Sequence, residues 1–216
     1  MEGGSSILRW SKRILHTGGL QVAVQGIGFL SGLLVIRRLT TEEYSFYTIA
    51  NSVLGMMSVL TDGGIGLAVM AQGGRVWQDD ERLGGILAAG LRLRRQFAGA
   101  SLLVAIPIMG VLLRRQGASW PVVGLLMGAV LLLFSATLTN QLLEIIPRLR
   151  QQISRLQRIQ IASATLRLCL LGLAVLVVPR AWGAVLAASL AIVWANLRMR
   201  RWISETMSYH GRGDQR

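Results

Sequence analysis

Residues 116–143 read QGASWPVVGLLMGAVLLLFSATLTNQLL and contain no Asp, Glu, Lys or Arg. The hydrocarbon core of a bilayer is about 30 Å thick, and a helix that crosses it needs about 20 consecutive, mostly apolar residues. A water-soluble chain of ordinary composition interrupts its apolar segments with charge every few residues. We therefore predict that this stretch holds a transmembrane helix.

Three further stretches lack charged residues in the same way, and they extend this prediction to the whole chain. They are residues 14–36, 96–113 and 181–197. Hydrophobic residues make up 52% of the 216 residues, which is high for a soluble domain.

The stretch at residues 14–36 is longer than a signal-peptide core and has no small-x-small cleavage site just after it, so we expect it to remain as a helix. The composition indicates an integral membrane protein.

Six membrane spans fit the pattern best, which predicts an all-α, six-helix transmembrane bundle. The second span starts near Tyr44 and ends between Thr61 and Gln72, and Arg167 interrupts the fifth. Residues 1–16 form a lead before the bundle, and residues 198–216 form a basic tail. The expected spans lie near residues 17–36, 44–66, 96–113, 120–141, 159–178 and 181–197.

Basic residues predict the orientation of the bundle, because short cytoplasmic loops carry an excess of Lys and Arg. With the N-terminus inside, inner segments hold 18 of the 23 basic residues and outer segments hold 5. The inner set is Arg9, Lys12, Arg13, Arg75, Arg82, Arg92, Arg94, Arg95, Arg148, Arg150, Arg155, Arg158, Arg167, Arg198, Arg200, Arg201, Arg212 and Arg216, and the outer set is Arg37, Arg38, Arg114, Arg115 and Arg180. We therefore expect both termini in the cytoplasm.

The net charge of +13 follows mainly from this orientation and from attraction to anionic lipid head groups. Binding of nucleic acid is disfavoured, because no basic patch alternates with surface aromatic residues. The inner segments also have the pattern of basic amphipathic helices. Residues 82–95 and 197–207 show it, and so does a series that continues the fourth span through a bend at Pro147: Leu142, Ile146, Leu149, Ile153 and Leu156. Such helices lie at the membrane surface or provide a docking surface for a cytoplasmic partner, and both readings stay open.

Small and polar residues inside the spans indicate helices that pack on one another. Small residues four positions apart allow close helix approach. They occur at Gly28 and Gly32, at Gly124 and Gly128, and at Ala184, Ala188, Ala191 and Ala195. Gln21 and Gln25 lie one turn apart on one face of the first span, where they form interhelix hydrogen bonds or line a hydrophilic cavity.

We find no catalytic motif, so we expect no enzymatic activity, no cofactor and no metal site. The two histidines, His16 and His210, lie near membrane ends, and no His pair has metal-ligand spacing. The chain contains neither a nucleophile elbow nor a Walker loop. Cys169 is the only cysteine, so no disulfide can form within the chain.

Asp62 is the one acidic residue between Glu43 and Arg75. If the second span ends at Thr61, Asp62 lies at the inner interface, where it caps a helix that starts at Gly63, and the two glycines allow a break. If the span continues to Gln72, the carboxylate lies deep in the membrane, faces the bundle interior and becomes a functional candidate. We favour the interfacial or broken-helix placement, and a break that faces a cavity is itself a recurring transporter feature.

Two stretches around this position resemble the polysaccharide (O-antigen) flippases, which export lipid-linked oligosaccharides and share a superfamily with the MATE drug exporters. VIRRLTTEEYSFYTIANSVL at residues 35–54 resembles their first outer loop and second helix, with the pattern Arg-x-Leu-x-x-x-Glu-Tyr-Gly, although Ser45 replaces the Gly. VLTDGGIGLAV at residues 59–69 resembles their Asp-x-Gly-Leu/Ile segment. The resemblance covers about residues 7–115, and the remainder agrees in topology.

This resemblance implies a multi-pass protein of the bacterial inner membrane that moves a lipid-diphosphate-linked oligosaccharide through a cavity. The cavity candidates are Gln21, Gln25, Asp62 and Arg167, and the loop motif places Arg38, Glu42 and Tyr44. Family members have twelve to fourteen helices, so six spans correspond to one N-terminal lobe, and transport then requires a homodimer or a second lobe. The alternative is a non-transporting membrane scaffold that binds polysaccharide-assembly enzymes through its basic inner helices.

Overall fold

The computed structural model describes the backbone of residues 3–76, 79–149 and 152–213, and the side chains of residues 19–76, 79, 81–149 and 152–202. This described part contains helices and turns but no strand. The lead of residues 1–16, Arg150 and the tail beyond residue 202 lie outside the described side chains. The helices are α1 Gly3–Arg38, α2 Thr41–Asp62, α3 Ile65–Gly73, α4 Asp80–Arg115, α5 Trp120–Leu143, α6 Ile145–Leu149, α7 Ile153–Val177 and α8 Ala181–Gly213.

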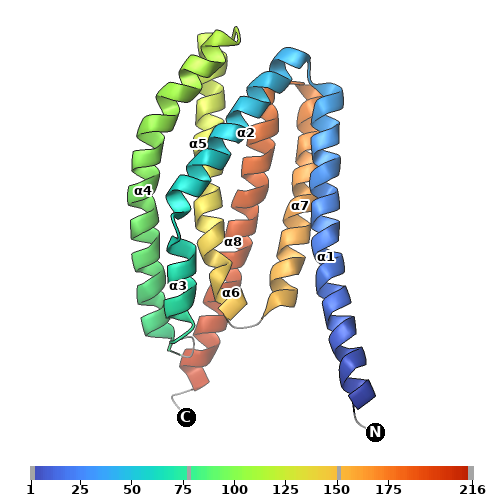
Figure 1. Cartoon of the computed structure of the whole chain (residues 1–216), viewed down its shortest axis with the longest axis vertical. Helices are drawn as coiled ribbons and strands as arrows, with labels where there is room; N and C mark the ends of the chain where they lie inside the picture. The colour runs from blue at the N-terminus through green and yellow to red at the C-terminus, as the bar shows by residue number, and fades with distance from the viewer. Residues whose placement is uncertain (1–2, 77–78, 150–151, 214–216) are drawn as a thin grey trace.

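The helices form an up-and-down bundle (Figure 1). The α1–α2, α4–α5 and α7–α8 turns lie at one end, which we call the hairpin end. Helix α1 begins and α8 ends at the opposite end, which we call the terminal end. The two ends of the chain therefore lie on the same side of the bundle, as an even number of spans requires. That this side is cytoplasmic remains a prediction from the distribution of arginines.

Five helices of the described chain are long and apolar enough to cross a membrane, and the bent pair α2–α3 raises the number to six if it forms one span. The two helices of that pair meet at 44°. Helix α7 has 25 residues, which at about 1.5 Å per residue extend over about 37 Å, more than the hydrocarbon core. The chain is thus a multi-pass membrane protein by helix length and composition.

Helices α5 and α8 form the centre of the bundle, where small side chains bring them together. Ala184 of α8 is fully buried in the same core cluster as Leu126 and Phe134 of α5, and Ala191 of α8 is also fully buried. The amide of Asn196 donates to the backbone oxygen of Ala136 at 2.8 Å, and the hydroxyl of Ser189 donates to that of Ala129 at 3.3 Å. The predicted packing role of the α8 alanines is confirmed.

The prediction for the two glycine pairs is wrong within this chain. A Cβ atom added at Gly28, Gly32, Gly124 or Gly128 would meet no other atom within 4 Å, so no neighbouring helix comes close there. Gly124 and Gly128 lie on the exposed face of α5. The close packing of α8 therefore depends on its alanines, whereas Gly73 and Gly90 provide the close contacts around α3 and α4.

The predicted interfacial helices are also revised. Residues 82–95 belong to the single long helix α4, and residues 197–202 continue α8. The apolar series that was expected to continue the fourth span is divided between α5, the short α6 and α7. Helix α5 stops at its C-cap residue Glu144, and Pro147 in α6 has no N–H to donate to a continuous helix. Four of the five residues in this series, among them Leu142, Ile146 and Leu156, are buried or half-buried inside the bundle, and only Ile153 is exposed.

Candidate functional site: two polar cavities in the bundle

The break between α2 and α3 is made by two consecutive glycines. Gly63 and Gly64 have φ of 40° and 84°, a left-handed conformation that glycine adopts without steric cost. Gly64 occupies the N-cap position of α3, where no side chain accepts a hydrogen bond from the helix. The prediction of a broken helix is confirmed. The prediction that Asp62 caps the next helix is wrong, because its carboxylate faces another partner.

That partner is Arg94 of α4. The guanidinium of Arg94 forms an ion pair with the carboxylate of Asp62, and its Nη1 donates to Oε1 of Gln141 on α5 at 2.9 Å. The Arg94 side chain is only 3% exposed, whereas Asp62 is 42% exposed. The sequence predicts that the third span starts near residue 96, which places Arg94 in an inner loop. The helix begins at Asp80 instead, so Arg94 lies inside the bundle.

The pair faces a cavity of about 700 Å³, which we call the break cavity. Gly66 allows the pair to form, because a Cβ atom there would lie 3.1 Å from Asp62 Oδ1 and 3.2 Å from Arg94 Nη2. The polar and charged side chains that line the cavity come from α2, α4, α5 with its C-cap residue, and α6. They are Ser58, Asp62, Arg94, Gln141, Glu144 and Arg148.

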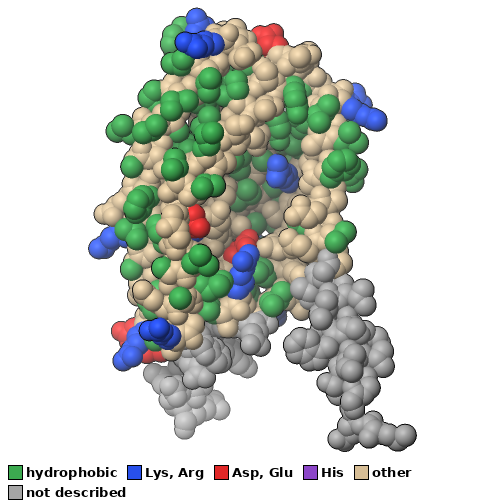
Figure 2. Space-filling model, viewed as in Figure 1, with side chains coloured by type: hydrophobic (Ala, Val, Ile, Leu, Met, Phe, Trp, Pro, Cys, Tyr) green, Lys and Arg blue, Asp and Glu red, His purple; other side chains and the backbone are tan. Residues whose placement is uncertain are grey.

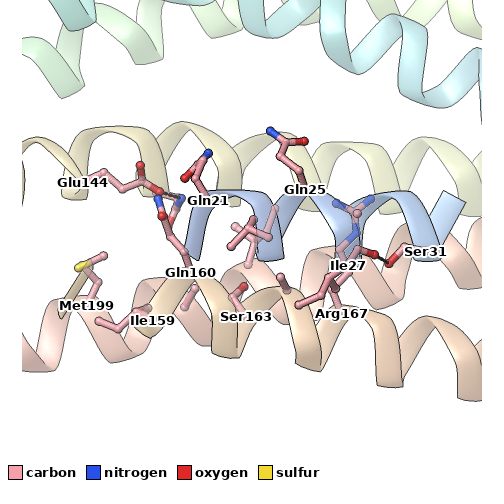
Figure 3. Close-up of a pocket in the computed structure, with 16 residues that line it drawn as sticks. Gln21, Gln25, Ile27, Ser31, Glu144, Ile159, Gln160, Ser163, Arg167 and Met199 are labelled. Carbon is pink, nitrogen blue, oxygen red and sulfur yellow. Dashed lines mark hydrogen bonds between the residues drawn. The ribbon is translucent and has the colours of Figure 1, made fainter. Parts of the chain in front are cut away.

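A second cavity of about 330 Å³ lies between α1, α5, α7 and α8, and we call it the α1–α7 cavity. It contains Gln21, Gln25 and Arg167, three of the four residues that the sequence nominates for a cavity. Figure 3 shows the two glutamines on α1 and the guanidinium of Arg167 extending from α7 to the region of Ile27 and Ser31. The structure brings these three together and leaves Asp62 in the break cavity.

Several polar groups of the α1–α7 cavity are already bonded to the protein. The hydroxyl of Ser31 donates to the backbone oxygen of Ile27 at 2.8 Å, and that of Ser163 donates to Ala191 of α8 at 3.2 Å. In contrast, Nε of Arg167 is buried and has no hydrogen-bond partner within the described residues. A buried donor without a partner is costly, and Nε of Arg94 beside the break cavity is also buried without a partner in the described part of the chain.

Glu144 lines both cavities and therefore lies between them. Its side chain is 14% exposed. It accepts hydrogen bonds from Nδ2 of Asn140 at 2.8 Å and from Nη2 of Arg148 at 2.7 Å. These residues are four positions apart on consecutive helical turns, a spacing that is visible in the sequence, although we did not identify Glu144 as a site residue.

Acidic and basic side chains also appear in the middle of the face shown in Figure 2, surrounded by hydrophobic side chains.

The loop motif lies at the hairpin end, far from these cavities. Arg38, Glu42 and Tyr44 are exposed and line neither cavity. The neighbouring Glu43 is not among the residues predicted from the motif, and its Oε2 accepts a hydrogen bond from the backbone N–H of Ala181 at 2.7 Å. Ala181 is the first residue of α8. A carboxylate at a helix N-terminus satisfies a free N–H and interacts favourably with the helix dipole.

These cavities offer cations, amides and carboxylates to a polar ligand. Within the described residues, no group of three or more His, Cys, Asp or Glu could hold a metal ion. Comparison with known proteins adds no assignment: no family model matches this chain, and no curated protein or solved structure is significantly similar to it.

Proposed function

We propose that this protein takes part in moving a lipid-linked oligosaccharide across the membrane, and that the α1–α7 cavity receives the polar head of that lipid. The observation that carries the proposal is the buried Nε of Arg167, which lacks a partner in the described chain and belongs to a side chain that lines a cavity with both polar and apolar walls. Ionisable residues inside membrane helices are costly and commonly mark the path of a substrate. The sequence resemblance to polysaccharide flippases favours the same function.

The chemistry of the cavity suits a diphosphate joined to a sugar. A guanidinium binds phosphate oxygens with two parallel hydrogen bonds. The amides of Gln21, Gln25 and Gln160 can donate to and accept from sugar hydroxyls. At about 330 Å³ the cavity is at the small end of ligand sites, which suits the diphosphate and the first sugar better than a whole oligosaccharide.

The wall of this cavity is peripheral, which favours access from the lipid. Helix α1 packs mainly against α7, and most of its described side chains, those of residues 19–38, are exposed. Helices α5 and α8 are the most buried part of the bundle. Alternating access requires two lobes that move against each other. We therefore propose that the transporting unit contains a second copy of this chain or a second lobe of different sequence.

The test is movement of a fluorescent isoprenoid-diphosphate sugar in liposomes that contain the full chain, measured as protection from an impermeant quencher. We expect Arg167→Gln to reduce both binding and movement by an order of magnitude or more, as expected when about 1.4 kcal/mol or more of binding free energy is lost. The matched control is Arg200→Gln, because Arg200 is exposed on α8 and lines neither cavity. A native chain that binds no such lipid would favour the scaffold alternative.

A further inference from the structure

The α1–α7 cavity carries one charge of each sign. Among its described lining residues, Arg167 of α7 is the only cationic one, and Glu144, the C-cap residue of α5, is the only anionic one. Arg167 forms no ion pair with any residue that the structure describes. The amides of Gln21, Gln25 and Gln160 belong to the same wall. The two charges are therefore separated by neutral polar groups.

These charges lie at opposite ends of the cavity. Figure 3 shows Glu144, Gln21 and Gln160 at one end and Arg167 near Ser31 at the other. Gln160 and Arg167 are two turns apart on α7, so about 10 Å separates their levels along the helix. Glu144 comes directly before α6, toward the terminal end of the bundle, whereas Arg167 lies near the middle of the 25-residue helix α7. The cavity is therefore polarised along the direction of the helices.

Two neighbouring side chains fix the carboxylate of Glu144. Nδ2 of Asn140 donates to its Oε1 at 2.8 Å, and Nη2 of Arg148 donates to its Oε2 at 2.7 Å. Arg148 does not line the α1–α7 cavity, and its side chain is 52% exposed. A carboxylate has about four lone-pair sites, so each oxygen keeps room for a further donor. Glu144 can therefore accept hydrogen bonds from hydroxyl groups in the cavity, while its charge disfavours a phosphate nearby.

We propose that Glu144 recognises the first sugar of the lipid-linked substrate and so determines the direction in which the head group binds. This inference rests on the proposed function of the cavity. The phosphates pair with the guanidinium of Arg167, and the sugar lies toward Glu144, where its hydroxyls donate to the carboxylate. The opposite direction would place phosphate against a carboxylate and leave the guanidinium without a counter-ion.

The bilayer favours the same direction. A lipid in the leaflet at the terminal end has its sugar toward the water at that end and its chain toward the membrane centre. Glu144 lies toward the terminal end and Arg167 lies deeper. A lipid from this leaflet can therefore enter the cavity without turning over.

Binding of two lipids to the purified full chain in detergent tests this inference. One is an isoprenoid diphosphate, and the other is the same lipid with one hexose attached. The ratio of their dissociation constants measures the preference for the sugar. We expect Glu144→Gln to lower this preference roughly threefold to tenfold, because a neutral acceptor forms a weaker hydrogen bond than a carboxylate. Affinity for the sugar-free lipid should not fall, since the variant removes a charge that repels phosphate.

Three further variants separate the contributions. Glu81→Gln is the matched control and should keep the native preference, because Glu81 is exposed on α4 and lines neither cavity. Arg167→Gln should weaken binding of both lipids by similar factors. Arg148→Gln removes the ion pair with Glu144 but keeps the carboxylate, so the preference should persist. A loss of preference as large in Arg148→Gln as in Glu144→Gln would assign the effect to the ion pair and overturn the inference.

The native chain distinguishes this inference from the proposed function without any variant. Equal affinity for the two lipids would overturn recognition of the sugar and leave the binding of the diphosphate standing. Failure to bind either lipid would overturn the proposed function and this inference with it. An equal loss for both lipids in Glu144→Gln would also overturn the inference, because recognition of the sugar requires a change in the ratio.

Discussion

Arg94 on α4 and Asp62 at the end of α2 form an ion pair at the point where Gly63 and Gly64 break the helix. The two members of the pair differ in environment, since the guanidinium is buried and the carboxylate opens onto the break cavity. The pair therefore ties α4 to the break while one of its charges remains accessible from the cavity.

This asymmetry predicts unequal effects of mutation. We expect Asp62→Ala to lower the free energy of unfolding by about 1–3 kcal/mol, because it leaves the buried guanidinium without a counter-ion. Arg94→Met should cost less, since the remaining carboxylate is 42% exposed. Thermal unfolding of the purified protein in detergent measures both effects.

The double variant Asp62→Ala/Arg94→Met provides the control for this pair. We expect it to be more stable than Asp62→Ala alone, because no buried charge is left unpaired. Effects that simply add in the double variant would show that the two residues do not interact.

Gly66 offers a test of the space around the same pair. Gly66→Ala places a methyl group close to both charged groups, so we expect lower stability and disturbed pairing. Gly55→Ala in the middle of α2 is the matched control, because a Cβ atom there meets nothing within 4 Å. The control should raise stability by roughly 0.5–1 kcal/mol through helix propensity. The two melting temperatures should move in opposite directions, and parallel shifts would contradict the geometry.

Glu43 is expected to stabilise the start of α8 from a distant part of the chain. Glu43→Ala removes the acceptor for the N–H of Ala181, and loss of such a cap costs about 0.5–2 kcal/mol. Glu42→Ala is the control, since the neighbouring side chain is exposed. A lower melting temperature in the Glu43 variant alone is the expected result, and equal losses would assign the effect to the acidic first turn of α2 instead.

The alanines of α8 should tolerate no increase in size. Ala184 is fully buried, so Ala184→Leu should destabilise the bundle by about 1–3 kcal/mol through overpacking against α5. Gly124→Leu adds an even larger group on the open face of α5, and we expect little loss of stability. Unfolding in detergent compares them, and a greater loss at Gly124 would mean that the close contact lies on the other face.

The predicted orientation is tested with single cysteines in a background that lacks Cys169. A cysteine in place of Arg75 lies at the terminal end, and one in place of Arg115 lies at the hairpin end. If the excess of arginines at the terminal end faces the cytoplasm, an impermeant thiol reagent added to intact cells should label only the Arg115 position. Labelling of the Arg75 position alone would invert the bundle.

Local patterns predicted the helices more reliably than the contacts between them. Long uncharged stretches identified the membrane-spanning helices, since the length of such a stretch is matched to the thickness of the bilayer. The Gly63-Gly64 break was also predictable, because consecutive glycines permit left-handed backbone. The start of α4 could not be predicted from the sequence, because the many charged residues among residues 80–95 are typical of a loop. That error placed Arg94 outside the bundle, although a lone intramembrane carboxylate such as Asp62 generally requires a cationic partner.

The sequence by itself indicated a helical, multi-pass membrane protein and favoured a helix break at Gly63 and Gly64, because hydrophobicity and backbone freedom are properties of the residues themselves. Only the tertiary structure decided which polar groups meet. The tertiary structure brings together Arg94 and Asp62, Glu43 and Ala181, and Arg167 of α7 with the two glutamines of α1. The partners in each case lie on different helices. Such pairings depend on how each helix is rotated and shifted against its neighbours, and packing of side chains such as Ala184 fixes that geometry.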